Sequence, residues 1–289
     1  MKISLVMATV GRASEVERFF KSLKEQSSRD MELIVVDQNE DDSLVRPVAI
    51  LRDAGVEVVH LKCGERNLSK ARNYGIARAR NELVGFPDDD CWYEKNLIET
   101  ILANFSSSAD LDGLVGRWHE QDPVGGEPKR LTWDRMREFR EASASSITLF
   151  FRKQVVEQIG GFDENLGISR WFGAGEETDL VMRCLRRGAN VRYIPNAVVH
   201  HAWAEVSAGG TTSDTFARIR ARSRGTGALY AKHRLPFYVI LRGILAPLLR
   251  LVVPPYGRTR AVMNAARAIG RFEGYFAWLW NQRLEKERK

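Results

Sequence analysis

An α/β fold with a mainly parallel sheet is predicted by three features of the sequence. Short apolar runs alternate with helical patterns through the first hundred residues, polar side chains follow the ends of these runs, and a separate basic segment closes the chain. Strands that alternate with helices of this length form parallel sheets through right-handed crossovers. Because ligands bind at the carboxyl ends of the strands in such sheets, the polar residues there are the first candidates for a site.

The expected elements follow from the period of the apolar residues, which differs between strands and helices. In the first part of the chain they are a strand at 3–8, a helix with an apolar stripe from 16 to 23, a strand at 33–36, a helix at 44–53, a strand at 56–61, a helix at 69–80 and a strand at 83–86. Further on they are a strand at 145–151, helices at 153–159 and 176–187, and strands at 191–194 and 197–199. Residues 119–130 are rich in Gly and Pro and are expected to form a loop.

Charge is unevenly distributed along the chain. The 289 residues contain 44 Lys and Arg against 37 Asp and Glu, a formal net charge of +7. Residues 216–289 hold 16 of the basic and 3 of the acidic residues, net +13, so residues 1–215 carry −6. A strongly basic segment indicates a polyanionic partner. The composition, 44% hydrophobic and 28% charged, excludes collagen-like, disordered and disulfide-scaffold proteins.

The expected location is the cytoplasm. Cys63, Cys91 and Cys184 are widely separated and form no CxxC pair, which favours reduced thiols. The N-terminal apolar run is too short for a signal peptide and fits a buried strand. The apolar stretch at 237–255 contains two Arg and an internal Pro, so we expect it to lie on a membrane rather than cross it.

The acidic triplet Asp88-Asp89-Asp90 directly follows an expected strand. Three adjacent carboxylates repel one another, and a strand end removes part of their solvent, so a divalent cation is a natural counter-charge. Carboxylate oxygens suit Mg2+ or Mn2+, either of which would also bind the phosphate oxygens of a substrate. The alternative is an acidic, solvated turn, because such triplets are common without a metal.

A second acidic group, formed by Glu176, Glu177 and Asp179, lies in the first turn of the helix expected at 176–187. The helix macrodipole alone favours carboxylates there by roughly 0.3–1 kcal/mol each, so simple capping is one interpretation. The other is a general base, because neighbouring negative charge would raise the pKa of Glu177 towards the useful range.

Two further groups have competing interpretations. His201 and its neighbour His200 follow the last expected strand, either as an added metal ligand or as ordinary surface or core histidines. Ser69 and Arg72 belong to the segment at 67–73, which supplies basic groups near the same sheet edge. The alternative for that segment is N-capping by Asn67 or Ser69 with Arg72 exposed.

Six segments occur in the order typical of one family. They are SLVMAT at 4–9, ELIVVD at 32–37, NLSKARN at 67–73, GFPDDD at 85–90, GGFDE at 160–164 and GEETDL at 175–180. Through these motifs the chain resembles a family 2 glycosyltransferase of the bacterial cell-envelope type, with a GT-A (Rossmann-like) fold over residues 1–215. The nucleotide-sugar half would cover about 1–118, the acceptor half about 119–215, and residues 216–289 would form a basic helical region.

The resemblance implies an inverting enzyme that transfers a hexosyl or related group from a nucleotide diphosphate sugar to an acceptor hydroxyl. The positions that match nucleotide-sugar binding are Thr9, Asp37, Asn39, Ser69, Arg72, Asp88 and Asp89. The positions that match the binding of Mn2+ or Mg2+ are Asp88, Asp90 and His201. Gln38 stands where the family often has a second Asp, which leaves the donor open between a UDP-, dTDP- and GDP-sugar.

The resemblance also places the base and the acceptor. Glu177 stands at the position of the usual aspartate base, but it is one methylene longer, so Glu176 and Asp179 remain alternatives. Trp171 and Phe172 are expected to stack on an acceptor sugar, with core packing as the other interpretation. The implied acceptor is a polysaccharide or a lipid-linked glycan in cell-envelope synthesis.

The basic region predicts attachment to the inner face of the cell membrane. Its expected helices carry an apolar face followed by an aromatic cluster, made by Tyr238, Leu241, Leu245, Leu248, Leu249, Tyr275, Phe276, Trp278, Leu279 and Trp280. Basic residues among them suit an anionic membrane surface. The alternative is packing on the catalytic part or on a second copy in a homodimer.

The sequence leaves two other functions open. A nucleotidyltransferase that makes sugar nucleotides has a similar fold, but its Gly-rich loop is not matched by the single Gly at 8–12. A protein that binds nucleic acid through the basic region is the second, but no recognition motif supports it, and we expect no nucleic-acid partner.

Overall fold

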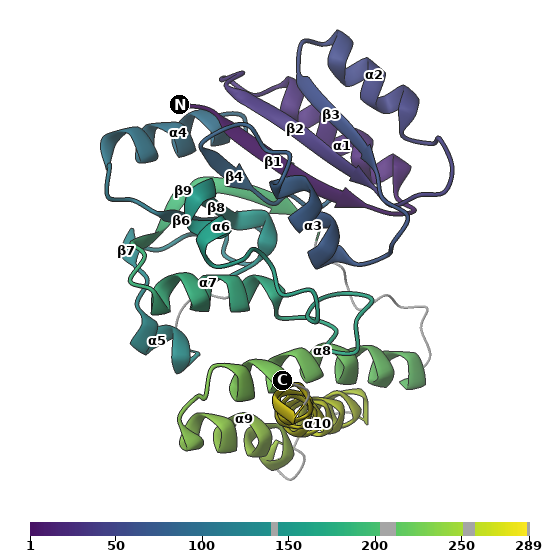
Figure 1. The fold of residues 1–289 in the computed structure, drawn as a ribbon, viewed down its shortest axis with the longest axis vertical. Helices are drawn as coiled ribbons and strands as arrows, with labels where there is room; N and C mark the ends of the chain where they lie inside the picture. The colour runs from purple at the N-terminus through teal and green to yellow at the C-terminus, as the bar shows by residue number, and fades with distance from the viewer. Residues whose placement is uncertain (140–143, 203–211, 251–257, 288–289) are drawn as a thin grey trace.

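The computed structural model describes residues 1–139, 144–202, 212–250 and 258–287. In this part of the chain a nine-stranded sheet forms the centre, with helices on both faces (Figure 1). The strands are β1 (Ile3–Thr9), β2 (Met31–Asp37), β3 (Glu57–Lys62), β4 (Leu83–Gly85), β5 (Cys91–Tyr93), β6 (Gly113–Trp118), β7 (Lys129–Arg130), β8 (Leu149–Arg152) and β9 (Val191–His201). The helices are α1 (Ala13–Lys24), α2 (Val45–Asp53), α3 (Leu68–Ile76), α4 (Leu97–Ser107), α5 (Trp133–Arg137), α6 (Lys153–Gln158), α7 (Glu176–Arg186), α8 (Thr212–Lys232), α9 (Phe237–Leu249) and α10 (Arg258–Glu287).

The sheet is mixed, as the family resemblance implies. Its order is β3-β2-β1-β4-β8-β6-β9-β5, with β7 paired beside β9. β1 pairs in parallel with β2 and β4, and β2 pairs in parallel with β3. β8 runs antiparallel to β4 and β6, whereas β9 is parallel to β6. The carboxyl ends of β1, β2, β3, β4, β6 and β9 therefore lie at one edge of the sheet.

Side chains alternate between the two faces of the sheet, as the pleat of a strand requires. Leu5 and Met7 join a buried cluster with residues of α1, α2 and α4. Val6 and Ala8 join a second cluster with residues of α3, α6 and α7. The two helical layers are thus fixed by the period of apolar residues in the sequence, and they leave the carboxyl edge of the sheet open for polar side chains.

Most predicted elements are confirmed, and the exceptions are local. The helix predicted at 69–80 ends at Ile76. The strand predicted at 145–151 begins as a 3-10 turn, Ser146–Thr148, which leads into β8. The loop predicted at 119–130 ends in the short strand β7, which pairs with β9.

The two strands predicted at 191–194 and 197–199 are wrong as separate elements, because they form the single strand β9. Pro195 lies between the two predicted strands, where the pairing register between β9 and β6 shifts. His200 and His201 are consequently the last residues of β9 rather than residues beyond it. They pair with β5, which follows the acidic triplet.

The last three helices form a layer beyond α7 (Figure 1). Helix α8 packs against the segment before α7, where the Gly173 N–H donates to Ala221 O at 3.1 Å. Gly225 approaches Ala174 so closely that a Cβ would lie 1.9 Å from its carbonyl oxygen. The boundary predicted between 215 and 216 falls inside α8. Among the described helices, none is both long enough and apolar enough to cross a membrane.

Candidate active site

The predicted site residues gather at the carboxyl edge of the sheet. Thr9 and Asp37 end β1 and β2, and they are register partners in the parallel ladder. Asp88 follows β4 and forms an isolated bridge with Ala8, which brings the acidic triplet beside β1. His201 ends β9 at the same edge. Parallel pairing therefore unites side chains that are far apart in the sequence.

Asp37 is fully buried and connects the ends of β2 and β3 with the turn after β1. Its carboxylate accepts hydrogen bonds from the Asn39 N–H at 2.9 Å and from its side-chain amide at 2.8 Å. It also contacts His60 Nε2 at 2.9 Å and Lys62 Nζ at 3.0 Å. Burial alone would raise the pKa of Asp37, but these donors outweigh burial and lower it. Asn39 Oδ1 in turn accepts from the Gly11 N–H at 2.6 Å.

Arg72 connects the two acidic groups. Its guanidinium is 1% exposed, donating through Nη2 to Asp88 Oδ1 at 2.7 Å and through Nη1 to Glu176 Oε1 at 3.3 Å. The Phe162 ring lies 5.2 Å from its Cζ atom. Its Nε and Glu176 Oε2 are buried and have no hydrogen-bond partner among the described residues. Arg72 is therefore a buried residue of the site, and an exposed helical charge is excluded.

Within the acidic triplet, Asp89 and Asp90 have different partners. Asp89 accepts from Thr9 Oγ1 at 2.7 Å and from Arg12 Nη1 at 3.1 Å. Burial raises the pKa of Asp89 to about 6, against the opposing effect of these donors. Asp90 contacts Arg12 and, at 2.9 Å, His201 Nε2. Burial alone would raise the pKa of Asp90, but His201 and Arg12 lower it.

Asp88, Asp90 and His201 form a group that fits a divalent cation. One ligand atom from each residue lies within 4.8 Å of the others. Two carboxylates and an imidazole are a donor set that Mn2+ accepts, and Mg2+ prefers the oxygens among them. The hydrogen bond with Asp90 raises the pKa of His201. The residues present therefore fit a metal ion, which would bind His201 in its neutral form.

Neighbouring groups hold His201 in place. The His201 N–H donates to Glu120 Oε2 at 3.0 Å, and its carbonyl oxygen accepts from Trp118 Nε1 at 3.2 Å. Glu120 also contacts His200 Nδ1 at 3.0 Å through its other oxygen. The ring of His201 lies edge-on to the Trp118 ring, with centroids 5.1 Å apart. These contacts fix the end of β9 and hence the direction of the imidazole.

Helix α7 presents Glu176 and Glu177 to the site. Gly175 precedes the helix with a φ of 98°, a conformation that favours glycine and lets the chain turn sharply into the first helical turn. Glu176 is buried against Arg72, whereas Glu177 is half-buried. Burial raises the pKa of Glu177 well above its usual value, and the Glu176 carboxylate raises it further. This environment is suited to a general base.

Asp179 lies in the same helical turn but has a different environment. It is fully buried and contacts Arg183 Nε at 2.7 Å, Lys232 Nζ at 2.7 Å and His233 Nε2 at 2.9 Å. Lys232 also pairs with Asp163. Burial alone would raise the pKa of Asp179, but His233, Lys232 and Arg183 lower it. Asp179 thus joins α7 to the end of α8.

The remaining predicted residues lie around this centre. Ser69 is buried, and its hydroxyl donates to Leu166 O at 2.8 Å. Phe172 is buried and packs against Trp278 with ring centroids 5.2 Å apart. Trp171 is 48% exposed, and the Arg224 guanidinium lies 4.4 Å above its ring. Of the two aromatic residues, only Trp171 has a free surface that could receive a sugar ring.

Several contributors were not predicted. Arg12 neutralises Asp89 and Asp90, and Ser146 lies 3.4 Å from Asp88 Oδ1. His60 and Lys62 come from β3 and reach Asp37 through the parallel pairing of β2 and β3. His60 and Lys62 could have been found from the sequence, because they are polar residues two positions apart near the end of β3. Arg12 had no comparable signal, because it lies in the turn after β1.

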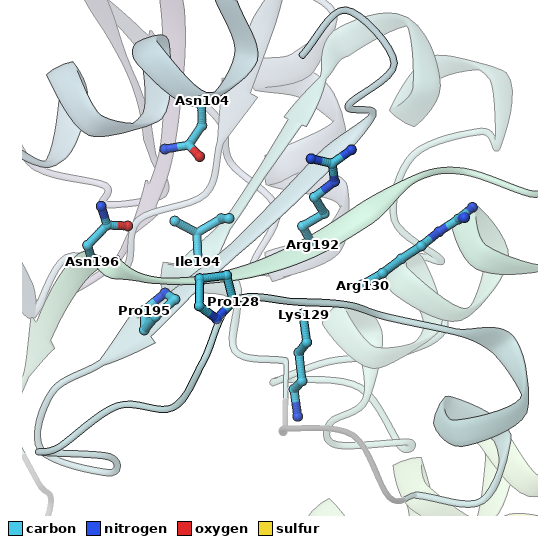
Figure 2. Close-up of a pocket in the computed structure, with 8 residues that line it drawn as sticks. All are labelled: Asn104, Pro128, Lys129, Arg130, Arg192, Ile194, Pro195 and Asn196. Atoms are coloured by element: carbon cyan, nitrogen blue, oxygen red, sulfur yellow. The ribbon is translucent and has the colours of Figure 1, made fainter. Parts of the chain in front are cut away.

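A separate hollow of about 570 Å3 lies beside residues 192–196 of β9 (Figure 2). Its lining residues are Asn104, Pro128, Lys129, Arg130, Arg192, Ile194, Pro195 and Asn196, none of them a predicted site residue. Arg192 pairs with Asp110 at 3.2 Å. The hollow is therefore not part of the site at the carboxyl edge.

Comparison with known proteins identifies the family. Residues 4–156, more than half of the chain, match the model of glycosyl transferase family 2. The chain belongs to this family. In this family 2 member, Asp88 and Arg72 lie inside the matched region, whereas Glu176, Glu177 and His201 lie beyond it.

Two relatives match beyond the family segment. A glucosyl-dolichyl phosphate glucuronosyltransferase of Haloferax volcanii is 25% identical over 182 residues, 58% of this chain and 58% of that protein. A pre-mycofactocin glycosyltransferase of Mycobacterium tuberculosis is 26% identical over 212 residues, 69% of this chain and 42% of that protein. The chain thus spans about half the length of these curated relatives.

Solved structures share the fold. S. aureus TarS 1-349 in complex with UDP-GlcNAc aligns over 96% of this chain and 92% of its own, with a TM-score of 0.60 and 15% identity. The mannosyltransferase PcManGT from Pyrobaculum calidifontis, in complex with GDP-Man and Mn2+, aligns over 96% of this chain and 72% of its own, with a TM-score of 0.61 and 14% identity. The prediction of a GT-A fold is confirmed.

Proposed function

We propose that this protein is a metal-dependent, inverting glycosyltransferase that moves a sugar from a nucleotide diphosphate sugar to an acceptor hydroxyl. One observation carries the proposal. Arg72 contacts both Asp88 of the metal-binding group and Glu176, the residue before Glu177. This link brings the candidate base beside the candidate diphosphate site, as a single displacement at the anomeric carbon requires. Family membership and the donor complexes of the two fold neighbours support it.

The donor would lie along the ends of β1, β2 and β4. Asp37 and Asn39 are held by each other and by Gly11, so they offer a preformed surface to the nucleoside. Arg72 and Arg12 supply positive charge on either side of the acidic triplet, where the diphosphate would bind. Ser69 would act indirectly, because its hydroxyl ties α3 to Leu166.

The metal site would be formed by Asp88, Asp90 and His201 and would hold Mn2+ or Mg2+. Such an ion supplies a Lewis acid that offsets charge on a departing diphosphate. The residues of the chain hold the nucleotide, orient the carboxylates and fix His201 through Glu120 and Trp118. A donor complex with Mn2+ in a fold neighbour supports a divalent ion at this site.

Glu177 would accept the proton of the acceptor hydroxyl as that hydroxyl attacks the anomeric carbon. General-base assistance of this kind contributes about 100- to 10,000-fold to the rate. Asp179 is a poor candidate for the base, because three cationic or imidazole groups already hold its carboxylate. Glu176 is occupied by Arg72, which leaves Glu177 as the carboxyl with a raised pKa.

The acceptor is proposed to be a polysaccharide or a lipid-linked glycan in cell-envelope synthesis. A relative whose name includes a dolichyl phosphate acceptor supports the lipid-linked form. The last helices expose large apolar side chains, suited to the inner face of a membrane: Phe237, Tyr238, Leu241, Leu245, Leu248, Leu249, Ile269, Phe272, Phe276, Leu279 and Trp280. Trp171 provides an exposed ring for an acceptor sugar.

A thermal-shift screen of UDP-, dTDP- and GDP-sugars with and without Mn2+ tests the donor and the metal together. We expect one nucleotide class to raise the melting temperature, and Mn2+ to enlarge that shift, because a ligand that binds only the folded state stabilises it. The stabilising donor is then incubated with membrane lipid extract, and sugar transfer is measured. No shift with any sugar nucleotide would contradict the proposal, and net synthesis of a sugar nucleotide would favour a nucleotidyltransferase.

Replacing Asp90 by Ala is expected to weaken Mn2+ binding by at least about 10- to 100-fold, the loss seen when even an outer partner of a metal site is removed. The reason is that Asp90 both offers a ligand oxygen and contacts His201 Nε2. Mn2+ binding is measured by the loss of the free-ion electron paramagnetic resonance signal. Asp53→Ala, at the exposed end of α2, is the control. Equal Mn2+ affinity in both variants would show that the ion binds elsewhere.

A further inference from the structure

A small hollow lies where α10 meets the segment between α6 and α7. It has a volume of about 160 Å3, and its lining residues are Asp163, Asn165, Phe172, Trp278, Asn281 and Gln282. The first three come from the loop before α7, and the last three come from α10. The volume is below the roughly 300–1,000 Å3 of pockets for larger organic ligands, so the hollow suits a ligand no bigger than one small ring with its substituents.

Two aromatic side chains supply the apolar part of this hollow. Phe172 and Trp278 are 5% and 8% exposed, and both belong to a buried cluster that includes Leu166 and Leu229. Trp278 was predicted to belong to an aromatic cluster facing a membrane, but it is buried here. Its Nε1 atom has no hydrogen-bond partner among the described residues. The hollow thus has an apolar wall fixed by packing, beside a donor that is still unpaired.

Amide side chains supply the polar part. In the described residues, no hydrogen bond is found for the side chains of Asn281 and Gln282. Asn165 donates through Nδ2 to Asp163 Oδ1 at 3.1 Å, which leaves its amide oxygen as an acceptor. Each amide offers two donors and an oxygen with two lone pairs. The amides of the hollow can therefore pair with hydroxyl groups both as donors and as acceptors.

The charge of the lining is balanced. Asp163 is the only acidic or basic residue among the lining residues that the structure describes, and its carboxylate is paired with Lys232. Lys232 Nζ also lies 5.4 Å from the centroid of the Trp278 ring. A balanced lining favours neither an anion nor a cation. A neutral ligand that combines hydroxyl groups with an apolar face fits the hollow, and a sugar ring has both properties.

A row of aromatic rings connects the hollow with the candidate acceptor position. Trp171, the exposed ring proposed for an acceptor sugar, lies edge-on to Phe172 with centroids 4.8 Å apart. Phe172 in turn packs against Trp278 of the hollow, with centroids 5.2 Å apart. The loop that carries the first two rings leads directly into α7 and Glu177. An acceptor of several sugars could therefore contact Trp171 and the hollow at once.

We propose that the hollow between α10 and the loop before α7 is a binding subsite for one neutral sugar residue of the acceptor glycan. An apolar part of the sugar packs against Phe172 and Trp278, and its hydroxyl groups pair with Asn165, Asn281 and Gln282. The inference rests on the proposed transferase function, but the subsite itself needs neither donor nor metal. It gives the last helix a role in selecting the acceptor, besides the membrane attachment proposed above.

The test compares the full-length protein with two double variants. N281A/Q282A removes two amides of the hollow, and Q154A/Q158A removes two exposed amides of α6. Binding of the methyl glycosides of glucose, galactose, mannose and N-acetylglucosamine is titrated by saturation-transfer NMR, without donor or metal. We expect at least one glycoside to bind the unaltered protein and Q154A/Q158A equally, and N281A/Q282A about 10-fold more weakly, because two hydrogen bonds are lost. No binding, or equal binding to N281A/Q282A, would overturn the subsite.

Two further measurements protect this test. The single variant Asn281→Ala changes only an exposed side chain, so weaker glycoside binding in it does not come from misfolding and supports the subsite. Sugar-nucleotide stabilisation is measured by thermal shift on the same proteins. Stabilisation by a donor without binding of any glycoside would overturn the subsite alone. Glycoside binding that depends on Asn281, without stabilisation by any donor, would support a sugar site and contradict the transferase proposal.

Discussion

Glu177→Gln is expected to lower the turnover of sugar transfer by about 100- to 10,000-fold, because the amide cannot accept the proton of the acceptor hydroxyl. Donor binding should change little, since Arg72 contacts Glu176 and not Glu177. Turnover is measured under saturating donor, and donor affinity is measured by thermal shift. Glu157→Gln on the surface of α6 is the matched control. Near-normal turnover in Glu177→Gln would assign the base to another residue.

The pH dependence tests the same role. A base works in its ionised form, and burial together with Glu176 raises the pKa of Glu177. Turnover should therefore rise with pH through that raised pKa and be low where an ordinary glutamate is already ionised. In Glu176→Gln, the loss of the neighbouring charge should shift the acidic limb of the profile to lower pH. An unmoved limb in this variant would contradict the link between the two carboxyls.

Asp179→Asn is expected to lower the free energy of unfolding by about 3–5 kcal/mol, because it leaves buried cationic groups without their counter-charge. Arg183 loses its anion, Lys232 keeps only Asp163, and His233 loses the carboxylate that its Nε2 contacts. Urea denaturation measures the change. Asp134→Asn is the control, because its pair with Arg137 spans 3.7 Å on the surface and should contribute less than about 1 kcal/mol.

Asp179→Asn also shows whether Asp179 stabilises the fold or takes part in the reaction. The lowered pKa of Asp179 means that its stabilising charge is present at neutral pH and is lost only as the pH falls below the usual range of an aspartate. Asp179→Asn should therefore resemble the unaltered protein most closely in acid. A fully stable Asp179→Asn protein without transfer activity would instead show that Asp179 takes part in the reaction.

Much of the fold could be predicted because the first hundred residues have clear periods. The alternation of Leu5 and Met7 with Val6 and Ala8 fixes both faces of β1. The strands that follow the acidic triplet were harder to predict. Strand β6 contains two glycines, which weaken any strand signal, and β5 directly follows the acidic triplet with no turn residue between them.

The candidate site could be predicted in part, because topology alone brings strand ends together. Thr9, Asp37 and Asp88 were placed at one edge by this reasoning, and the structure has them there. The partners of Asp179 could not be predicted in this way. Lys232 and His233 come from the end of α8, and no local pattern records a contact over more than fifty residues.

The close contact between Gly225 and Ala174 has a consequence for where the protein can work. It joins α8 to the segment before α7 with no room for a side chain between them, and Lys232 makes a second connection at the C-terminal end of α8. The layer of α8, α9 and α10 would then be rigidly connected to the rest of the protein rather than flexibly linked to it. If the last layer lies on a membrane, these contacts would hold Glu177 at a fixed height above the lipid. Acceptors would be sorted by how far their hydroxyl projects from the bilayer.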